Sequence, residues 1–202
     1  MMNISFLKIF FAGIILAITI NFPVLAQENL NYVFTAGGEN ADKPYSCLID
    51  DMGYSYLTGS FSGNADFGDI SLYSKGNADA FAALADPYGN YIRCFSFGGN
   101  FNDYAVAIEV DSDHNIIIAG NFSSDTLFFC GGNHLVKKSD QDIFIIKISP
   151  YGELFWARSF GNIGNDVISD IELDSYDNIY ATGPYNNFLD LGNNKTIAAN
   201  GG

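Results

Sequence analysis

The stretch Asp174-Ser-Tyr-Asp-Asn-Ile-Tyr-Ala-Thr-Gly183 joins a polar segment to a short apolar run that ends on glycine. This pattern predicts a tight turn followed by a β-strand. The same pattern occurs twice earlier, at residues 50–59 and 111–120. The closing glycines Gly59, Gly120 and Gly183 recur with a period of about 61–63 positions, so the sequence predicts a chain built from a repeated unit.

Other motifs keep the same spacing. Asp86-Pro-Tyr-Gly89 and Ser149-Pro-Tyr-Gly152 are turn sequences with proline early and glycine last, and they are separated by one period of the repeat. Each follows an apolar run that opens with an acid, Asp79–Ala85 or Asp142–Ile148. The wholly apolar run at 116–119 is typical of a strand that is covered on both faces.

Each copy of the repeat holds about four main strands and an extra excursion after the second one. Four strands at this period predict an all-β protein, a β-propeller whose antiparallel blades bury their faces against one another. We place the copies at 30–90, 91–153 and 154–202. A parallel β-helix and a β-sandwich are the competing folds, but neither accounts for both the hairpin turns and the regular period.

The third copy is predicted to be truncated. Leu189-Asp-Leu-Gly192 matches Ala65-Asp-Phe-Gly68, and the next strand would begin near position 205 if the spacing continued. We therefore expect an open arc of about 2.5–3 blades, against the four to eight blades of closed propellers. A fragment of a longer protein is the first explanation, and self-assembly of short chains into a ring is the alternative. Open edges would then favour self-association.

The motif order Asp-x-Phe-x-x-Lys, Pro-x-Gly, Gly-Gly, Asp and Asp-x-x-x-Asn-x-Tyr-x-x-Gly resembles the bacterial SBBP-type β-propeller repeat. The matching positions are Asp142, Phe144, Lys147, Pro150, Gly152, Asp166, Asp174, Asn178, Tyr180 and Gly183. The resemblance covers residues 30–202 and implies an exported or cell-surface bacterial protein with no catalytic residues to transfer. The first copy departs from the pattern at Leu84 and Tyr54, and the second has Ile117 where the third has Tyr180.

The N-terminal segment 1–26 has the layout of a secretory signal peptide. Lys8 precedes the mostly apolar run 9–20, and Val24-Leu-Ala26 places small residues before a cleavage point at Gln27. An uncleaved membrane anchor is the alternative, but Asn21 and Pro23 shorten the run below the roughly 20 apolar residues of a spanning helix. We expect a mature chain of residues 27–202 that is secreted or at the cell surface, with no further membrane span.

Charge limits the class of partner. The full chain has a net charge of −14, and removing 1–26 leaves 23 acidic and 8 basic side chains, a net charge near −15. Such a surface repels nucleic acid and anionic membranes. It aids solubility and favours cations or basic partners.

The three cysteines are Cys47, Cys94 and Cys130. Export permits a disulfide, but three thiols cannot all pair within one chain. Cys47 and Cys94 lie in apolar, strand-like runs at positions that do not match in the repeat, so we interpret them as small buried hydrophobes. The alternative of one bridge stays open.

Several acidic motifs are candidate sites, and we interpret each as structural. The segment 111–115 resembles the start of a calcium loop, but Ile116 and Phe122 stand where such a loop needs glycine and an acid, which favours a hairpin turn. Acids recur at equivalent repeat positions, which favours turn capping over one convergent centre. These acids are Asp42, Asp79, Asp103, Asp142 and Asp166. His114 and His134 do not match in the repeat. No catalytic, cofactor or metal residue is predicted.

Two functions remain. The first is a non-enzymatic secreted or cell-surface scaffold that binds an unknown protein or glycan ligand. The second is a propeller-type enzyme, a lyase or a glycan-active protein, whose catalytic groups lie in a missing part. Few histidines, arginines and glutamates stand in the predicted loops, which favours the scaffold, although fold alone does not assign function.

Overall fold

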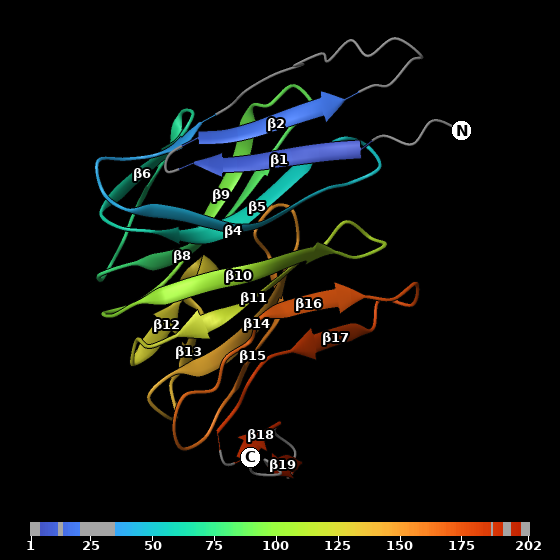
Figure 1. The fold of residues 1–202 in the computed structure, drawn as a ribbon. Helices are drawn as coiled ribbons and strands as arrows, with labels where there is room; N and C mark the ends of the chain where they lie inside the picture. The colour runs from blue at the N-terminus through green and yellow to red at the C-terminus, as the bar shows by residue number, and fades with distance from the viewer. Residues whose placement is uncertain (1–4, 12–13, 21–34, 187, 192–194, 199–202) are drawn as a thin grey trace.

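The computed structural model describes residues 5–11, 14–20, 35–186, 188–191 and 195–198. Within these ranges all of the regular secondary structure is β-strand, except for the short 3-10 segment Cys130–Gly132 (Figure 1). The all-β class predicted from the repeat is therefore confirmed. No helix in the described part of the chain is long and apolar enough to cross a membrane.

Two four-stranded antiparallel sheets form the centre of the molecule. The first has the order β4-β5-β8-β9, with β4 at Asp42–Ile49, β5 at Ser55–Phe61, β8 at Asp79–Ala85 and β9 at Tyr91–Phe97. The second has the order β10-β11-β14-β15, with β10 at Asp103–Val110, β11 at Ile116–Phe122, β14 at Asp142–Ile148 and β15 at Leu154–Phe160. A third unit begins with β16 at Asp170–Leu173, which pairs with β17 at Ile179–Thr182. These are the propeller blades that the period predicted.

Each unit also carries the predicted excursion after its second strand. The excursion hairpins are β6 (Asn64–Phe67) with β7 (Ile70–Tyr73), β12 (Thr126–Phe128) with β13 (His134–Val136), and β18 (Phe188–Asp190) with β19 (Thr196–Ala198). The two-residue strand β3, Ala36–Gly37, pairs with β6. A further hairpin, β1 (Ser5–Phe11) with β2 (Ile14–Ile20), lies within the predicted signal peptide, which stays a prediction.

The blades are out of phase with the copies read from the sequence. The strand β9, which opens the copy 91–153, hydrogen-bonds to β8 and completes the first sheet. In the same way β15, which opens the copy 154–202, completes the second sheet. Each sheet therefore takes its fourth strand from the following copy, so backbone hydrogen bonds tie neighbouring copies together.

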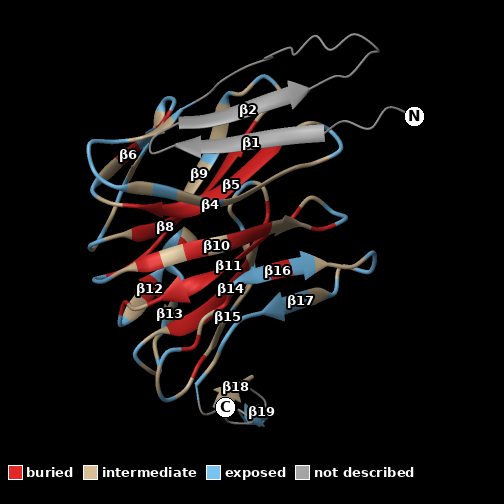
Figure 2. Cartoon of the chain, in the orientation of Figure 1, coloured by how far each residue is buried: buried red, intermediate tan, exposed pale blue. Residues whose placement is uncertain are grey.

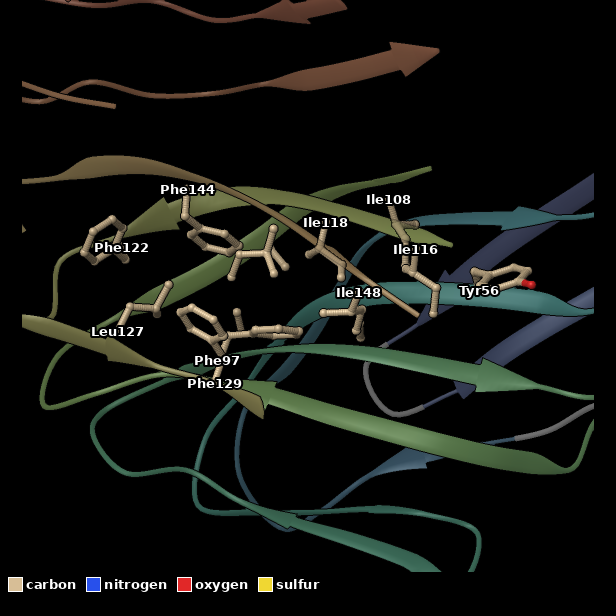
Figure 3. Packing of buried hydrophobic residues seen from close by; sticks show 14 of the residues in the cluster. Tyr56, Phe97, Ile108, Ile116, Ile118, Phe122, Leu127, Phe129, Phe144 and Ile148 are labelled. Atoms are coloured by element: carbon tan, nitrogen blue, oxygen red, sulfur yellow. The ribbon is translucent and has the colours of Figure 1, made fainter. Parts of the chain in front are cut away.

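Neighbouring sheets pack face to face (Figure 1). Strand β10 lies against β4, β5 and β8 of the first sheet and also against β16 of the third unit. Figure 3 shows the largest apolar cluster between the first two sheets, in which Phe97 of β9 stacks on Phe144 of β14 with ring centroids 6.4 Å apart. A second apolar cluster lies between the other face of the second sheet and β16, and it includes Ile143, Ile145 and Ile171.

The central strands are covered on both faces, as the apolar run at 116–119 predicted. Every residue of β5, β8 and β11 is buried (Figure 2). Phe81 and Phe144, at matching positions of β8 and β14, are 4% and 0% exposed, which confirms their predicted burial.

The glycines that close the first two repeats make room for a ring. Gly120 pairs with Phe144 across the β11–β14 ladder, and a Cβ atom on Gly120 would lie 2.5 Å from the Phe144 ring. Gly59 stands in the same relation to Phe81, at 2.7 Å. A side chain at either position would collide with that ring and also with a backbone carbonyl of the preceding strand, that of Tyr104 or Lys43, so both positions require glycine.

Candidate binding face at the hairpin loops

Five hairpin loops share one design. In an antiparallel meander the loops that follow the first and third strands lie at the same end of the sheet. These loops span residues 50–54, 86–90, 111–115, 149–153 and 174–178. The strands they connect are β4–β5, β8–β9, β10–β11, β14–β15 and β16–β17. We call this group of loops the loop face.

The first side chain of each loop holds the turn together. In the loop 111–115, the amides of Asp113 and Asn115 donate to one Asp111 carboxylate oxygen, at 3.0 and 2.8 Å. The fourth residue has a left-handed backbone, with φ near +61° at His114 and +87° at Gly89. This geometry confirms the hairpin turn predicted for the segment that resembles a calcium loop.

A cation already neutralises Asp111. The Lys147 ammonium lies 2.5 Å from its second carboxylate oxygen, and the Asn115 side-chain amide donates to the same oxygen at 3.0 Å. Desolvation opposes ionisation, but the hydrogen bonds from Lys147 and Asn115 outweigh it and hold the pKa of Asp111 below its ordinary value. The carboxylate therefore serves to fix β14 to the loop.

The recurrent acids cap turns, as predicted. Asp103 is fully buried, and its carboxylate accepts bonds from the amides of Gly99, Ser123 and Ser124 and from the Ser124 hydroxyl. Burial raises the pKa of Asp103. Asp42 and Asp166, which match Asp103 in the repeat, accept amide bonds from turns in the same way, and so do Asp79 and Asp142, which match each other.

Loops of neighbouring sheets touch. The His114 ring nitrogen Nδ1 lies 3.8 Å from an Asp50 carboxylate oxygen, and Tyr56 donates its hydroxyl to that same oxygen at 3.1 Å. A cavity of about 270 Å³ opens beside this contact, between the first and second sheets. Its wall includes Arg93, His114 and Tyr151, so it combines aromatic surface with a cation.

Exposed aromatic side chains stand at the third position of three loops. Tyr88, Tyr151 and Tyr176 are 82%, 78% and 85% exposed. Met52 takes the same position in the loop 50–54 and is 54% exposed. The sequence signal was the Pro-Tyr-Gly turn for Tyr88 and Tyr151 and the Asp-Ser-Tyr-Asp-Asn turn for Tyr176. These motifs predict the turns but not that the rings are exposed to solvent.

The histidines are not brought together. His114 lies in a loop, whereas His134 lies on β13, where its ring centroid is 6.0 Å from that of Phe128. In the described part of the chain, no three histidine, cysteine or acidic side chains are arranged to hold a metal ion.

The cysteines pack as small hydrophobes within the described residues. Cys47 and Cys94 lie against the apolar cluster around Phe81, and Cys130 lies against the cluster around Phe144. Burial raises the pKa of the Cys94 thiol to about 12, which makes it a poor nucleophile.

Comparison with known proteins supports a propeller. No family model matches the sequence. The chain is 30% identical over 172 residues to an uncharacterized WD repeat-containing protein of Acanthamoeba polyphaga mimivirus. The match includes 80% of this chain but only 12% of the length of that relative. A WD repeat-containing relative suggests a β-propeller repeat family, in agreement with the stacked sheets.

Proposed function

We propose that this chain is part of an exported, non-enzymatic β-propeller scaffold that binds a protein or glycan ligand through its loop face. The observation that carries the proposal is that an exposed tyrosine stands at the third position of three of these loops, at Tyr88, Tyr151 and Tyr176. Tyrosine offers a large amphipathic contact surface at a low cost in side-chain entropy. Rigid sheets hold these loops in place, which further favours binding.

The polar groups near the loops support a scaffold over an enzyme. Asp50, Asp86 and Asp174 each use a carboxylate oxygen to accept bonds from their own turn. A catalytic centre needs unequal groups that converge on one reacting atom. The loop carboxylates instead stabilise equivalent turns in successive units. The WD repeat-containing relative also supports a scaffold.

We also propose that the repeat is of the bacterial SBBP type and that residues 1–26 are removed on export. The motif order from Asp142 to Gly183 supports the first part, and the Lys8, apolar run and Ala26 layout supports the second. Intact mass of protein exported by a bacterial host should correspond to a start at Gln27. Full-length chain in the membrane fraction would contradict export.

Binding by the loop face is tested on glycan and secreted-protein arrays. We expect a ligand that binds the parent chain and loses at least about tenfold in affinity when Tyr88, Tyr151 and Tyr176 are all changed to alanine, as hot-spot aromatics do. Tyr73→Ala is the matched control, because Tyr73 is also exposed, at 70%, but lies on the excursion hairpin β6–β7. Equal loss in both variants, or no loss in either, would contradict the loop face.

Self-association through open sheet edges is a further part of the proposal. Light scattering across a range of concentrations should show a mass that rises with concentration. A single monomer mass throughout would contradict it.

A further inference from the structure

The pocket of about 270 Å³ on the loop face lies between two sheets that each have all four of their strands. One wall comes from the first sheet and its β4–β5 loop, and the other comes from the β10–β11 and β14–β15 loops of the second sheet. Its volume is near the lower end for small-ligand sites, roughly 300–1,000 Å³. The pocket therefore has room for one ring-sized group.

The pocket lies where the first copy of the repeat departs from the second. In the second sheet, Lys147 of β14 reaches the loop carboxylate of Asp111. In the first sheet, Leu84 stands at the repeat position of Lys147 and lines the pocket. Asp50, which matches Asp111, accepts the Tyr56 hydroxyl at 3.1 Å instead. Because a leucine side chain is shorter than a lysine and uncharged, the first sheet leaves room beside its loops and places no ammonium there.

The first sheet carries a cation on its next strand instead. Arg93 of β9 is the cross-strand partner of Leu84, and it lines the pocket from an exposed position. Among the described residues its guanidinium donates one hydrogen bond, to the Ile92 carbonyl at 2.7 Å, and forms no ion pair. A guanidinium has five N–H donors in a planar fork that matches a carboxylate. Arg93 therefore has donors available for an anionic group.

Two tyrosines line the pocket from opposite sheets, Tyr54 in the loop 50–54 and Tyr151 in the loop 149–153. The second loop packs against the first sheet at Gly152, where a Cβ atom would lie 2.7 Å from the Phe95 ring. This close approach fixes the loop that carries Tyr151. The negative face of an aromatic ring attracts weakly positive C–H groups, such as those on the face of a sugar ring.

The acid nearest to the pocket is already satisfied. The Asp50 side chain is only 6% exposed, and one of its oxygens accepts the amides of Met52 and Tyr54. The other oxygen lies 3.8 Å from the His114 ring nitrogen Nδ1. None of the described residues that line the pocket is acidic, although the chain has a net charge of −14. The lining therefore favours an anionic group over a cationic one.

The loop amides beside the pocket are not available to a peptide backbone. The Tyr54 amide donates to Asp50 at 2.8 Å. The amides of Tyr151 and Glu153 donate to the Ser149 hydroxyl oxygen at 3.2 and 3.1 Å. A ligand would thus be recognised by side chains rather than by strand addition. A ring that bears a carboxylate uses the aromatic walls and the guanidinium together, whereas an acidic side chain of a peptide has no flat face to pack.

We propose that this pocket binds an acidic sugar residue of a glycan, with the sugar carboxylate on Arg93 and the sugar ring against Tyr54 and Tyr151. The proposal rests on the proposed binding function and names the class of ligand for one part of the loop face.

Methyl glucuronide and methyl glucoside are matched probes, because they differ only in carrying a carboxylate or a hydroxymethyl group. Saturation-transfer NMR of each sugar, titrated with the full chain, gives the two dissociation constants. We expect the glucuronide to bind at least about tenfold more tightly, as a charge-assisted bidentate contact implies. Equal affinity for the two sugars, or no binding of the glucuronide, would overturn the proposal.

Two arginine variants sharpen the test. Arg93→Leu should weaken glucuronide binding at least about tenfold and leave glucoside binding and circular dichroism unchanged. Arg158→Leu is the matched control, because Arg158 is an exposed arginine on β15 outside this pocket, and it should bind both sugars as the parent chain does. A preference for glucuronide that survives in Arg93→Leu, or that is lost equally in both variants, would overturn the proposal.

An acidic peptide side chain is the competing ligand, and N-acetylglutamate amide tests it. This compound should bind at least about tenfold more weakly than the glucuronide, since it lacks a ring to pack on the tyrosines. Equal affinity would replace the acidic sugar by an acidic peptide and overturn the proposal. Tyr151→Ala should weaken binding of both sugars, and unchanged binding in that variant would contradict the placement of the sugar ring.

The outcome is separable from that of the loop face as a whole. A variant with alanine at Tyr88 and Tyr176, which are not among the lining residues, should bind the glucuronide as the parent chain does. Loss of the array ligand in the triple tyrosine variant, with no preference of the parent chain for glucuronide, contradicts the pocket alone. Glucuronide binding that depends on Arg93, with the array ligand retained in the triple variant, contradicts the wider loop face and leaves the pocket standing.

Discussion

Ser112 binds Asp177 across two loops, with its hydroxyl 2.6 Å and its amide nitrogen 3.1 Å from the two carboxylate oxygens. Ser112 lies in the β10–β11 loop and Asp177 in the β16–β17 loop. His114 has the same loop position as Asp177 and approaches Asp50 of the preceding unit. Both residues have a left-handed backbone, a conformation that is uncommon for residues other than glycine. At both positions a residue with a side chain takes this conformation, and that side chain contacts the preceding unit.

We expect this link to be measurable as a coupling. Ser112→Ala and Asp177→Asn should each lower the free energy of unfolding in urea, and the double variant should lose less than the sum. A coupling of about 0.5–1 kcal/mol is expected for an exposed, charge-assisted pair. Asp69→Asn, at an exposed acid outside the loop face, should be additive with Ser112→Ala. Strict additivity of the Ser112 and Asp177 variants would show that the link does not stabilise the stack.

Loss of a buried turn-capping acid should lower the free energy of unfolding far more than loss of the link between Ser112 and Asp177. Asp103→Ala removes an acceptor from three amides and one hydroxyl. The Ser123 amide keeps its bond to the Asn102 carbonyl, whereas the amides of Gly99 and Ser124 and the Ser124 hydroxyl would lose their buried acceptor. We expect a loss of about 3 kcal/mol in the free energy of unfolding, given the cost of unpaired buried groups. Asp113→Ala, at an exposed position in a loop, should change it by less than about 0.5 kcal/mol. Similar effects at both positions would contradict the capping role of Asp103.

The strands and turns could be predicted from the sequence because each is encoded by a short stretch of residues that recurs at a fixed spacing. Turn residues and apolar runs repeat at fixed spacing, so Asp79–Ala85 and Asp142–Ile148 could be identified as strands, and burial of Phe81 and Phe144 followed from their matching positions. The phase of the sheets could not be predicted, because hydrogen bonding of β9 to β8 joins residues of two sequence copies. The approach of His114 to Asp50 likewise depends on how the sheets stack.

Phe144 should be among the most costly positions to truncate. Its side chain is fully buried between the sheets, and Phe144→Ala should lower the free energy of unfolding by about 3–5 kcal/mol. Phe155→Ala is the matched control, because Phe155 is 57% exposed on β15. Chemical denaturation of both variants provides the comparison. A loss below about 1 kcal/mol at Phe144 would mean that the strand register is wrong.

Stability should fall as pH rises from about 4.5 to 7, because of Glu109 on β10. Burial, with Glu172 and Asp170 of β16 adding repulsion, raises the pKa of Glu109 from 4.5 to about 7. The folded state therefore binds more protons than the unfolded state in this window, and the free energy of unfolding decreases as Glu109 ionises. Asp79, with a pKa raised to about 6 by burial, acts in the same direction.

Glu109→Gln should remove the Glu109 contribution, which dominates above about pH 6, leave the Asp79 contribution below that pH, and raise the melting temperature at pH 8. Glu153→Gln, at an exposed position in the β14–β15 loop, is the control and should leave the profile unchanged. Melting curves from pH 4.5 to pH 8 check this. A profile in which Glu109→Gln remains as steep as the parent chain would contradict the assignment to Glu109.

The central claim is that repeat units fold as sheets which stack face to face, and the contact between Phe97 and Phe144 tests it most directly. Ring protons of the two side chains should show a nuclear Overhauser effect, since their centroids are 6.4 Å apart although they belong to different sheets. Phenylalanine-labelled chain, with Phe97→Leu and Phe144→Leu to assign the rings, suffices. We predict this cross-peak together with one from Phe144 to the Gly120 α-protons. The Gly120 cross-peak without the Phe97 one would contradict the stacked-blade account.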